Sequence, residues 1–376
     1  MIDFTNRLKS LKDRRQGALE RATLEKMALN KAMGLESLSL DDRKKERYEQ
    51  LNKSDAIKYT IGAMSPVEPQ ATKVSIEEGE RIANTLIDLL ATDGINTTSR
   101  MQGSVPLDIH IKGHSDVDML ILIDNVVQYE NPCAPGVSYI PAKDPRTMVD
   151  IVKELREKCE EKLTRRYPAV DVDCQNAKSI AMSGGSLRRK VDIVPSNWFD
   201  NIDYQRTNDE TERQVRIYNK KEHKLLGNSP FKHIKLVNQK DAIYKGNLKK
   251  CVRLLKNLVA DMPDYKKVKA KKLSSFDIVG ICYNMDSLLN VSEYTPLALV
   301  DATLTQLGRL RYIQEARDIR VPDNSRKVFD NEEKVSALEV IHEEILSLAE
   351  ALYKDINGPS VDRYKAEPLR EMQIAF

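Results

Sequence analysis

The chain of 376 residues has few of the features that mark exported, membrane-spanning or metal-stabilised proteins. Its five cysteines are scattered, form no C-x-x-C pair, and lie at zinc-finger spacing from none of its five histidines. No stretch approaches the roughly 20 apolar residues that span a bilayer. The first residues contain no apolar signal-peptide core. We therefore expect a cytoplasmic protein with reduced thiols and no membrane partner.

An excess of charge of one sign is also lacking, because 60 Lys and Arg stand against 57 Asp and Glu, for a net charge of +3. This balance does not indicate a nucleic-acid binder, so we expect no specific nucleic-acid partner. Aromatic residues make up only 6%, but 41% of the residues are hydrophobic, which excludes a disordered chain. At roughly 100–200 residues per domain, the length predicts two domains or one bilobed domain.

The hydrophobic periodicity predicts an α+β protein with a small mixed sheet and a C-terminal helical lobe. We expect a helical arm over 1–60, a mixed core over 61–205 and a helical domain over 206–376. Ser75-x-x-Glu78 has the pattern of a capping box and predicts that a helix begins near residue 76. Strands are expected at 96–102, 117–123, 169–174, 178–183 and 190–195. Further helices are expected along 148–163, 247–260, 275–289, 297–313 and 333–353.

The most informative stretch is MQGSVPLDIHIKGHSDVDMLILI, residues 101–123. Gly103 and Ser104 follow a predicted strand, and after eleven intervening residues Asp116 and Asp118 open the next one. Residues i and i+2 of a strand share a face, so both carboxylates project together. Two ionised carboxylates repel unless a cation lies between them, and Mg²⁺ prefers such oxygen ligands. The pair is a candidate metal site, with Gly103 and Ser104 as candidate phosphate contacts.

The same pattern recurs at Asp171 and Asp173, so D-x-D alone is weak evidence. This second pair has no upstream Gly-Ser and is followed by the polar CQNAK, which favours an ordinary half-exposed strand. A third acid, Asp192, lies between Val191 and Ile193 on a buried-looking strand and needs a partner there. A salt bridge to a preceding basic residue or a metal ion would each satisfy it. Beside the first pair we favour the metal, as part of a two-metal site.

Gly-Ser, eleven residues, D-x-D and a later strand with one Asp before I-V-P together resemble the nucleotidyltransferases of the polymerase-β type. More narrowly, QGSVPLDIHIKGHSDVDML resembles the bacterial CD-NTases, which are cyclic-oligonucleotide synthases related to animal cyclic GMP-AMP synthase. The resemblance runs from about residue 60 into the helical lobe. It implies a bilobed polymerase-β-like fold and a catalytic, metal-binding role for Asp116, Asp118 and Asp192. It also implies two Mg²⁺ ions, which Mn²⁺ can replace. The zinc insertion of the animal enzymes is absent, so DNA sensing is not implied.

The helix expected over 247–260 carries further residues that the resemblance singles out. Lys249 and Lys256 belong to a basic stripe, which in most helices is simply solvated. In the family, a lysine of this helix and a Ser-Ser-aromatic motif about twenty residues later bind the donor triphosphate. Lys256 and Ser275 match that pattern, whereas Lys249 is expected to face solvent. Phe276 takes the aromatic position, where it either stacks on a base or fills the core.

The resemblance implies an enzyme that joins NTPs (ATP, GTP, UTP or CTP) into a cyclic di- or trinucleotide second messenger and releases pyrophosphate. A downstream effector that senses the product, in anti-phage signalling, is implied by analogy alone. A nucleotidyltransferase that modifies RNA, a protein or a small molecule would share every metal ligand. A glycosyltransferase also uses D-x-D, but it needs neither the Gly-Ser nor the third Asp. A catalytically dead nucleotide-binding module would be marked by a lost carboxylate.

Overall fold

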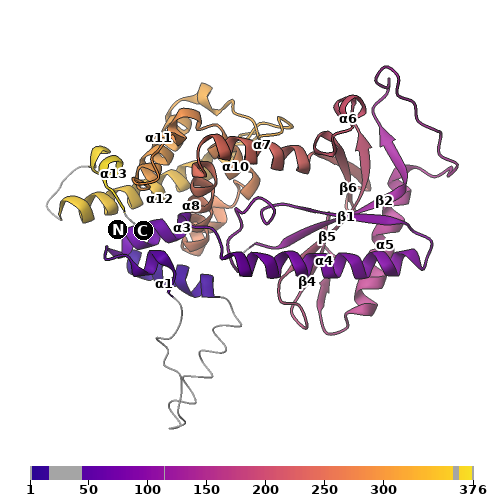
Figure 1. The fold of residues 1–376 in the computed structure, drawn as a ribbon, viewed down its shortest axis with the longest axis horizontal. Coiled ribbons are helices and arrows are strands. Elements are labelled where there is room, and N and C mark those ends of the chain that lie inside the picture. Colours follow the sequence, from indigo (N-terminus) through magenta and orange to yellow (C-terminus); the bar gives the residue numbers. More distant parts are fainter. Residues whose placement is uncertain (1, 17–44, 114, 359–363, 375–376) are drawn as a thin grey trace, which may run out of the picture. The chain divides into compact units, whose positions relative to one another are not determined.

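The computed structural model describes residues 2–16, 45–113, 115–358 and 364–374. The chain forms two compact units, which differ in their secondary structure (Figure 1). The first, here called the sheet unit, comprises residues 68–108 and 115–239. The second, the helical unit, comprises residues 1–67, 109–114 and 240–376. The α+β class expected from the sequence is confirmed.

The sheet unit contains one seven-stranded sheet among its described residues. Its elements are α4 (Pro69–Ala91), β1 (Thr97–Gln102), β2 (Val117–Tyr129), α5 (Met148–Arg166), β3 (Asp171–Asp173), β4 (Ile180–Ser183), β5 (Val191–Asp200), α6 (Ile202–Thr207), η3 (Glu210–Glu212), β6 (Gln214–Asn219) and β7 (Lys224–Asn228). The strand order is β1-β2-β5-β4-β3, and β6 pairs with the second half of β5 and with β7. β2 and β5 are parallel, whereas the other pairs are antiparallel.

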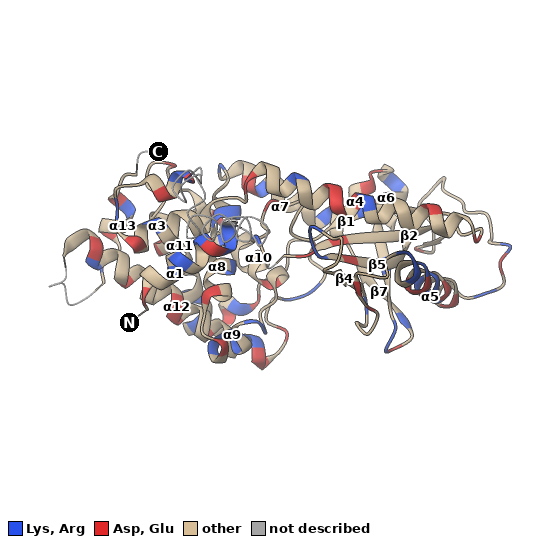
Figure 2. Ribbon diagram, turned by 90° about the horizontal axis from the view of Figure 1, so that it is seen from below, with Lys and Arg blue, Asp and Glu red and all other residues tan. Residues whose placement is uncertain are grey.

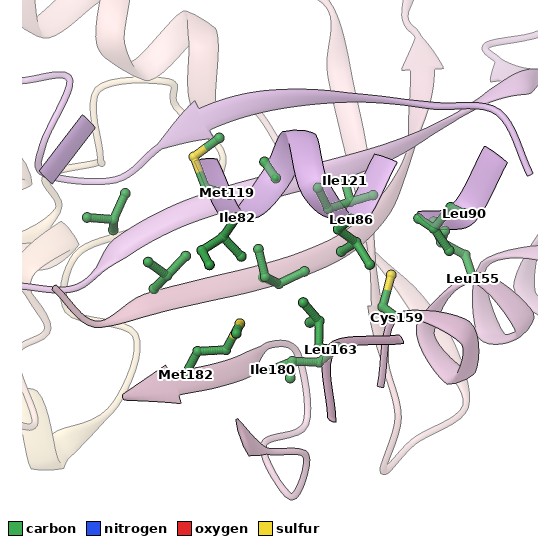
Figure 3. Packing of buried hydrophobic residues seen from close by; sticks show 14 of the residues in the cluster. Ile82, Leu86, Leu90, Met119, Ile121, Leu155, Cys159, Leu163, Ile180 and Met182 are labelled. Carbon is green, nitrogen blue, oxygen red and sulfur yellow. The ribbon is translucent and has the colours of Figure 1, made fainter. Parts of the chain in front are cut away.

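Helices α4 and α5 pack on one face of this sheet (Figure 3). Their apolar side chains meet alternate residues of the central strands: Ile82, Leu86, Leu90, Leu155, Cys159 and Leu163 from the helices, and Met119, Ile121, Ile180 and Met182 from the strands. Side chains alternate between the two faces of a strand, so Asp118 and Asp192 lie on the face opposite to α4 and α5. Further along that face, the strands bury Leu120 and Val194 together with Trp198.

The helical unit is built around α8 (Asn247–Asp261), most of whose residues are buried. Its other elements are α1 (Phe4–Gln16), η2 (Arg47–Gln50), α3 (Asp55–Met64), α9 (Asp264–Ala270), α10 (Ser275–Tyr283), η4 (Asp286–Leu289), α11 (Ala298–Tyr312), η5 (Gln314–Arg317), α12 (Glu332–Asn357) and α13 (Glu367–Glu371). α7 (Pro230–Ile243) leads into it from the sheet unit. Arg14 of α1 pairs with Asp261 at 2.5 Å, so this part of the predicted arm packs on the unit. Residues 17–44 of the arm lie outside the described residues.

The structure departs from the sequence prediction in two places within the sheet unit. α4 begins at Pro69, because proline fits the first turn of a helix, and Glu68 is its N-cap. The predicted capping box is therefore wrong: Ser75 is buried inside the helix and bonds to the carbonyl of Ala71. β6 and β7 continue the sheet beyond residue 205, so the compact unit ends near residue 239 and the helical unit includes the N-terminal helices.

Charged residues of both signs are intermixed along the helices of each unit, as the near-equal numbers of basic and acidic residues suggest (Figure 2). The basic run KKVKAKK, at 266–272, lies mostly within α9. Lys266 and Lys272 of this run pair with Glu344 and Glu333. Among the described residues, no helix is both long and apolar enough to cross a membrane.

Candidate functional site

Two of the three predicted acids lie side by side in the middle of the sheet. Asp118 of β2 and Asp192 of β5 are direct partners in the parallel register, so their side chains emerge from the same face. Both side chains are half-buried, and both stand near the N-terminal ends of their strands. The structure thus brings together two carboxylates that are 74 positions apart in the sequence (118 to 192).

The Gly-Ser turn lies directly against the first of these carboxylates. Gln102, the last residue of β1, pairs with Asp118, and the chain then turns at Gly103, whose φ is +81°. A Cβ atom built on Gly103 would lie 2.3 Å from Oδ2 of Asp118. Only glycine can therefore occupy this position without displacing the carboxylate. Ser104 follows in the same turn and is partly exposed, as a phosphate contact requires.

Asp116 precedes β2 by one residue and acts electrostatically on Asp192. The pKa of Asp192 is raised, first because burial disfavours its charged form, and further because Asp116 and Asp173 add negative charge nearby. A hydrogen bond from Ser179 and the charge of Lys190 act in the opposite direction. In the part of the chain that the structure describes, no three His, Cys, Asp or Glu side chains are gathered closely enough to hold a metal ion.

The donor set of the site nevertheless fits a hard divalent cation. Asp116, Asp118 and Asp192 offer only oxygen ligands, which Mg²⁺ prefers, and Mg²⁺ usually completes its shell with water and substrate phosphates. The mutual repulsion that raises the pKa of Asp192 is the kind of repulsion that a bound cation relieves. The three side chains are not gathered into a complete metal site by themselves, but their chemistry fits a cation whose remaining ligands are water and nucleotide phosphates.

The second D-x-D pair lies on the same face of the sheet but at its edge. Asp173 of β3 is opposite Ala181 of β4, and Ala181 is opposite Asp192. Asp171 and Asp173 are both exposed, so the expected half-exposed strand is confirmed. One oxygen of Asp173 accepts a hydrogen bond from the backbone N–H of Gln175 at 2.8 Å.

Sequence reasoning missed Ser179, whose hydroxyl donates to Oδ2 of Asp192 at 3.1 Å. It also missed Glu78 of α4, which is 1% exposed. Glu78 accepts hydrogen bonds from Arg81 and from the backbone N–H and side chain of Arg188, in the loop before β5. A glutamate within an apolar helix face was a usable signal for Glu78. A serine in a polar loop carried none for Ser179.

Lys256, Ser275 and Phe276 belong to the helical unit. Lys256 is buried, and its Nζ donates to the backbone carbonyl of Ile109 at 2.7 Å. It thereby fixes the backbone of Ile109, which precedes Asp116 by seven residues in the sequence. The expectation that Lys249 faces solvent is wrong, because its side chain is 18% exposed and lies 3.8 Å from the carboxylate of Asp241.

The Ser-Ser-Phe motif begins α10, as expected. Ser274 is the N-cap and forms a capping box with Asp277, so its hydroxyl is engaged within the helix turn. Ser275 is the first helical residue and is exposed. Phe276 is half-buried, with the guanidinium carbon of Arg326 5.3 Å from its ring centre. Ser275 is thus accessible to a ligand, and Phe276 is only partly committed to the core.

Comparisons with known proteins identify the family. Residues 235–350 match the C-terminal helical domain of the cGAS/DncV-like nucleotidyltransferases. A cyclic dinucleotide synthase, CdnE of Yersinia aleksiciae, is 37% identical over 99% of this chain and 98% of its own length. The chain belongs to the CD-NTase family. The resemblance drawn from the acids and the Gly-Ser turn is therefore confirmed, and this CD-NTase is a nucleotidyltransferase of the cyclic-oligonucleotide synthase class.

Other CD-NTases agree in sequence and in fold. A c-di-GMP synthase of Capnocytophaga granulosa is 30% identical over 78% of this chain and 86% of its own length. The solved STING-associated CdnE c-di-GMP synthase of that organism superposes with a TM-score of 0.69 at 27% identity, covering 93% of this chain and 99% of that one. The polymerase-β-like architecture expected from the sequence is confirmed.

Proposed function

We propose that this CD-NTase joins two NTPs into a cyclic dinucleotide second messenger, with release of pyrophosphate, in a reaction that depends on Mg²⁺. One observation carries the proposal: Asp118 and Asp192 are partners on adjacent parallel strands, with Gly103 pressed against Asp118. The 37% identity to a cyclic dinucleotide synthase over nearly the whole chain supports a two-nucleotide ring. A trinucleotide ring remains the alternative product.

The residues of this chain act by positioning and by proton transfer. When bound, Mg²⁺ ions on Asp116, Asp118 and Asp192 would neutralise phosphate charge, and Mn²⁺ would serve in their place. Ser104, Lys256 and Ser275 hold the donor triphosphate, and Phe276 lies beside the base. The acceptor ribose hydroxyl forms a bond to the α-phosphorus, the bond from that phosphorus to the bridging oxygen of pyrophosphate breaks, and Asp192 takes the proton.

Ring closure repeats the same transfer. The linear intermediate turns round, its own 5′-triphosphate becomes the donor, and its free ribose hydroxyl becomes the acceptor. A second pyrophosphate then leaves, and the product retains no terminal phosphate.

The comparison with relatives favours GTP as the substrate of this chain, since curated relatives of 26–30% identity are c-di-GMP synthases. The solved Capnocytophaga enzyme is described as STING-associated. By analogy, we propose that the product of this chain is sensed by a downstream effector in anti-phage signalling. ATP, UTP and CTP are the alternatives that a substrate test must include.

Incubation with single NTPs and with all four, in Mg²⁺ or Mn²⁺, tests the proposal. A linear product ends in a 5′-triphosphate that phosphatase removes, whereas a cyclic product resists it. We expect a phosphatase-resistant product whose mass equals that of two NMPs joined in a ring, and we expect GTP alone to suffice.

The rival activity has a different signature in the same experiment. A nucleotidyltransferase that modifies RNA, a protein or a small molecule would label product only after such an acceptor is added. Product that requires an added acceptor would overturn the cyclase proposal and leave the metal-site assignment standing.

A further inference from the structure

The carboxylate of Asp192 is held by a single side-chain hydroxyl. Ser179 lies immediately before β4, and its Oγ donates to Oδ2 of Asp192 at 3.1 Å. Among the described residues, no side-chain hydrogen bond engages Oδ1, which leaves that oxygen for a metal ion or a proton. Ala181, the residue of β4 that directly opposes Asp192, carries no polar group. The rotamer of Asp192 therefore depends on Ser179.

Ser179 is in turn fixed from the opposite side of the sheet by a buried arginine. Arg156 of α5 is 1% exposed, and its Nε donates to Oε1 of Glu160 at 2.7 Å. Its Nη2 donates to three backbone carbonyls of the segment between β3 and β4, those of Cys174, Asn176 and Ser179, at 3.2, 3.2 and 3.0 Å. A planar guanidinium can satisfy several carbonyls in a fixed geometry, which a lysine cannot.

Lys220 also forms hydrogen bonds that hold the segment between β3 and β4. The backbone N–H of Lys220 donates to the carbonyl of Ala177 at 2.8 Å, and its Nζ donates to both oxygens of Glu160 at 2.9 and 3.1 Å. Glu160 thus links Lys220 to Arg156. A buried ion pair is often no more stabilising than apolar residues of the same size, so stability alone does not account for Arg156. What the network provides is a fixed position for residues 174–179.

We propose that Ser179 is a positioning residue that orients Asp192 for metal binding, and that Arg156 is the buried anchor that fixes Ser179. The inference rests on the proposed function, because the orientation of Asp192 matters only if Asp192 binds metal. Groups that hydrogen-bond to a metal ligand typically change metal affinity or activity by about 10–100-fold when removed. Ser179 is such a group, because it hydrogen-bonds to the proposed metal ligand Asp192.

Binding of Mn²⁺ in the presence of a non-hydrolysable GTP analogue, followed by the electron paramagnetic resonance signal of free Mn²⁺, tests the role of Ser179. We expect Ser179→Ala to weaken Mn²⁺ binding about 10-fold, and Ser179→Thr, which keeps the hydroxyl, to restore most of it. In turnover assays, Ser179→Ala should lower kcat at limiting Mg²⁺, excess Mg²⁺ should recover it, and KM for the nucleotide should stay unchanged.

Ser183→Ala is the matched control. Ser183 also lies on β4 and faces the same side of the sheet as Ala181, but its register partner is Asp171 rather than a site acid. The Ser183→Ala variant should bind Mn²⁺ with the same affinity as the unaltered protein. Equal Mn²⁺ affinity of Ser179→Ala and the unaltered protein would overturn the proposal. If the unaltered protein forms no nucleotide product, the proposed function fails, yet the Mn²⁺ titration still decides the role of Ser179.

Hydrogen exchange of the backbone amides tests the anchor. Arg156→Lys keeps the positive charge but loses the planar guanidinium that bonds to the three carbonyls. The backbone amides of residues 174–179 should therefore exchange at least about 10-fold faster, while those of β2 stay protected. Unchanged exchange would remove Arg156 from the proposal. If Arg156→Lys does not fold, Glu160→Gln replaces it, since this change weakens the pairing of the guanidinium and should also speed exchange at 174–179. Unchanged exchange there would overturn the anchor.

Discussion

The chain contains the tripeptide Asp-Val-Asp twice, at 116–118 and at 171–173, and the two copies have different surroundings. The first opens β2, a thirteen-residue strand in the interior of the sheet, where Asp118 is flanked by Gln102 of β1 and Asp192 of β5. The second forms all of β3, a three-residue strand at the edge of the sheet, where β4 is its one partner among the described residues. Asp118, Asp171 and Asp173 all face the same side of the sheet.

The difference indicates that the proposed metal site depends on converging strands rather than on a local pattern. Asp118 gains its neighbours because β2 and β5 run parallel and begin at the same edge, which aligns two carboxylates in register. Asp173 has an alanine as its direct neighbour, and one of its carboxylate oxygens accepts a hydrogen bond from the backbone N–H of Gln175. The same tripeptide therefore has different neighbours in the two places.

The sharpest way to break this comparison is to neutralise each pair in turn. Asp118→Asn or Asp192→Asn should lower the rate of NTP consumption by roughly 1,000-fold or more, because metal ligation supplies several kcal/mol of transition-state stabilisation. Asp171→Asn and Asp173→Asn should remain within a few-fold of the unaltered rate. Initial rates of pyrophosphate release measure all four. Near-normal turnover of either Asp118→Asn or Asp192→Asn would remove that residue from the site.

The contact between the Gly-Ser turn and Asp118 can be broken separately. In Gly103→Ala, the new methyl group would overlap Oδ2 of Asp118, so we expect about 100-fold slower turnover. Gly136→Ala is the control, since Gly136 has nearly the same φ (+82° against +81°), and no described heavy atom lies within 4 Å of its added Cβ. Both variants should lose similar stability, about 1 kcal/mol, through the positive φ. Equal rates in the two would show that the turn does not position Asp118.

Two lysines of α8 extend the comparison to the helical unit. Lys256→Met should weaken nucleotide binding roughly 10–150-fold, the usual effect of losing a charge-assisted phosphate contact. Lys249→Met should weaken it by less than about 3-fold, because Lys249 already pairs with Asp241. Fluorescence titration with a non-hydrolysable GTP analogue measures both. Equal effects would mean that the basic stripe acts as a general cationic surface.

The smallest effect concerns Glu78, which fixes the loop leading into β5 and Asp192. Burial opposes its ionisation, but hydrogen bonds from Arg81 and Arg188 outweigh burial and lower its pKa below the ordinary 4.5. Its stabilisation is therefore fully present above pH 4.5 and is lost as the pH falls through the lower pKa of the folded state. Glu78→Gln should reduce the free energy of unfolding by about 1–3 kcal/mol at pH 7, and by progressively less on acidification.

Denaturant unfolding of both proteins at several pH values from 3 to 7 gives this difference. The neighbouring Glu77→Gln is the control, because the Glu77 side chain is 45% exposed and its ion pairs with Lys73 and Arg188 span 3.9 and 3.7 Å, with no hydrogen bond to Arg188 of the kind that Glu78 accepts. It should change stability by less than about 0.5 kcal/mol. A pH-independent loss in Glu78→Gln would show that packing, rather than the ionised carboxylate, holds the loop.

The elements with strong periodicity were predictable, and those set by pairing were not. The apolar stripes of α5, α8, α11 and α12 and the cores of β2 and β5 lie where the sequence placed them. β6 and β7 were missed because they are short, and because pairing of β6 with β5 and of β7 with β6, rather than their own pattern, makes them strands. The start of α4 was misplaced because Ser75 and Glu78 imitate a capping box, whereas their burial is decided by tertiary contacts.

By itself, the sequence determined the chemistry available to this protein: three aspartates, a Gly-Ser turn at a fixed spacing, and the family to which these belong. The residues around the two Asp-Val-Asp pairs favoured the first pair as the metal site, but they did not establish that Asp192 is the direct register partner of Asp118. Only the tertiary structure decided this, by aligning β2 and β5 in register across residues far apart in the sequence. It also gave Asp192 the hydroxyl of Ser179, because a long-range pairing of strands decides which polar groups meet in a half-buried place.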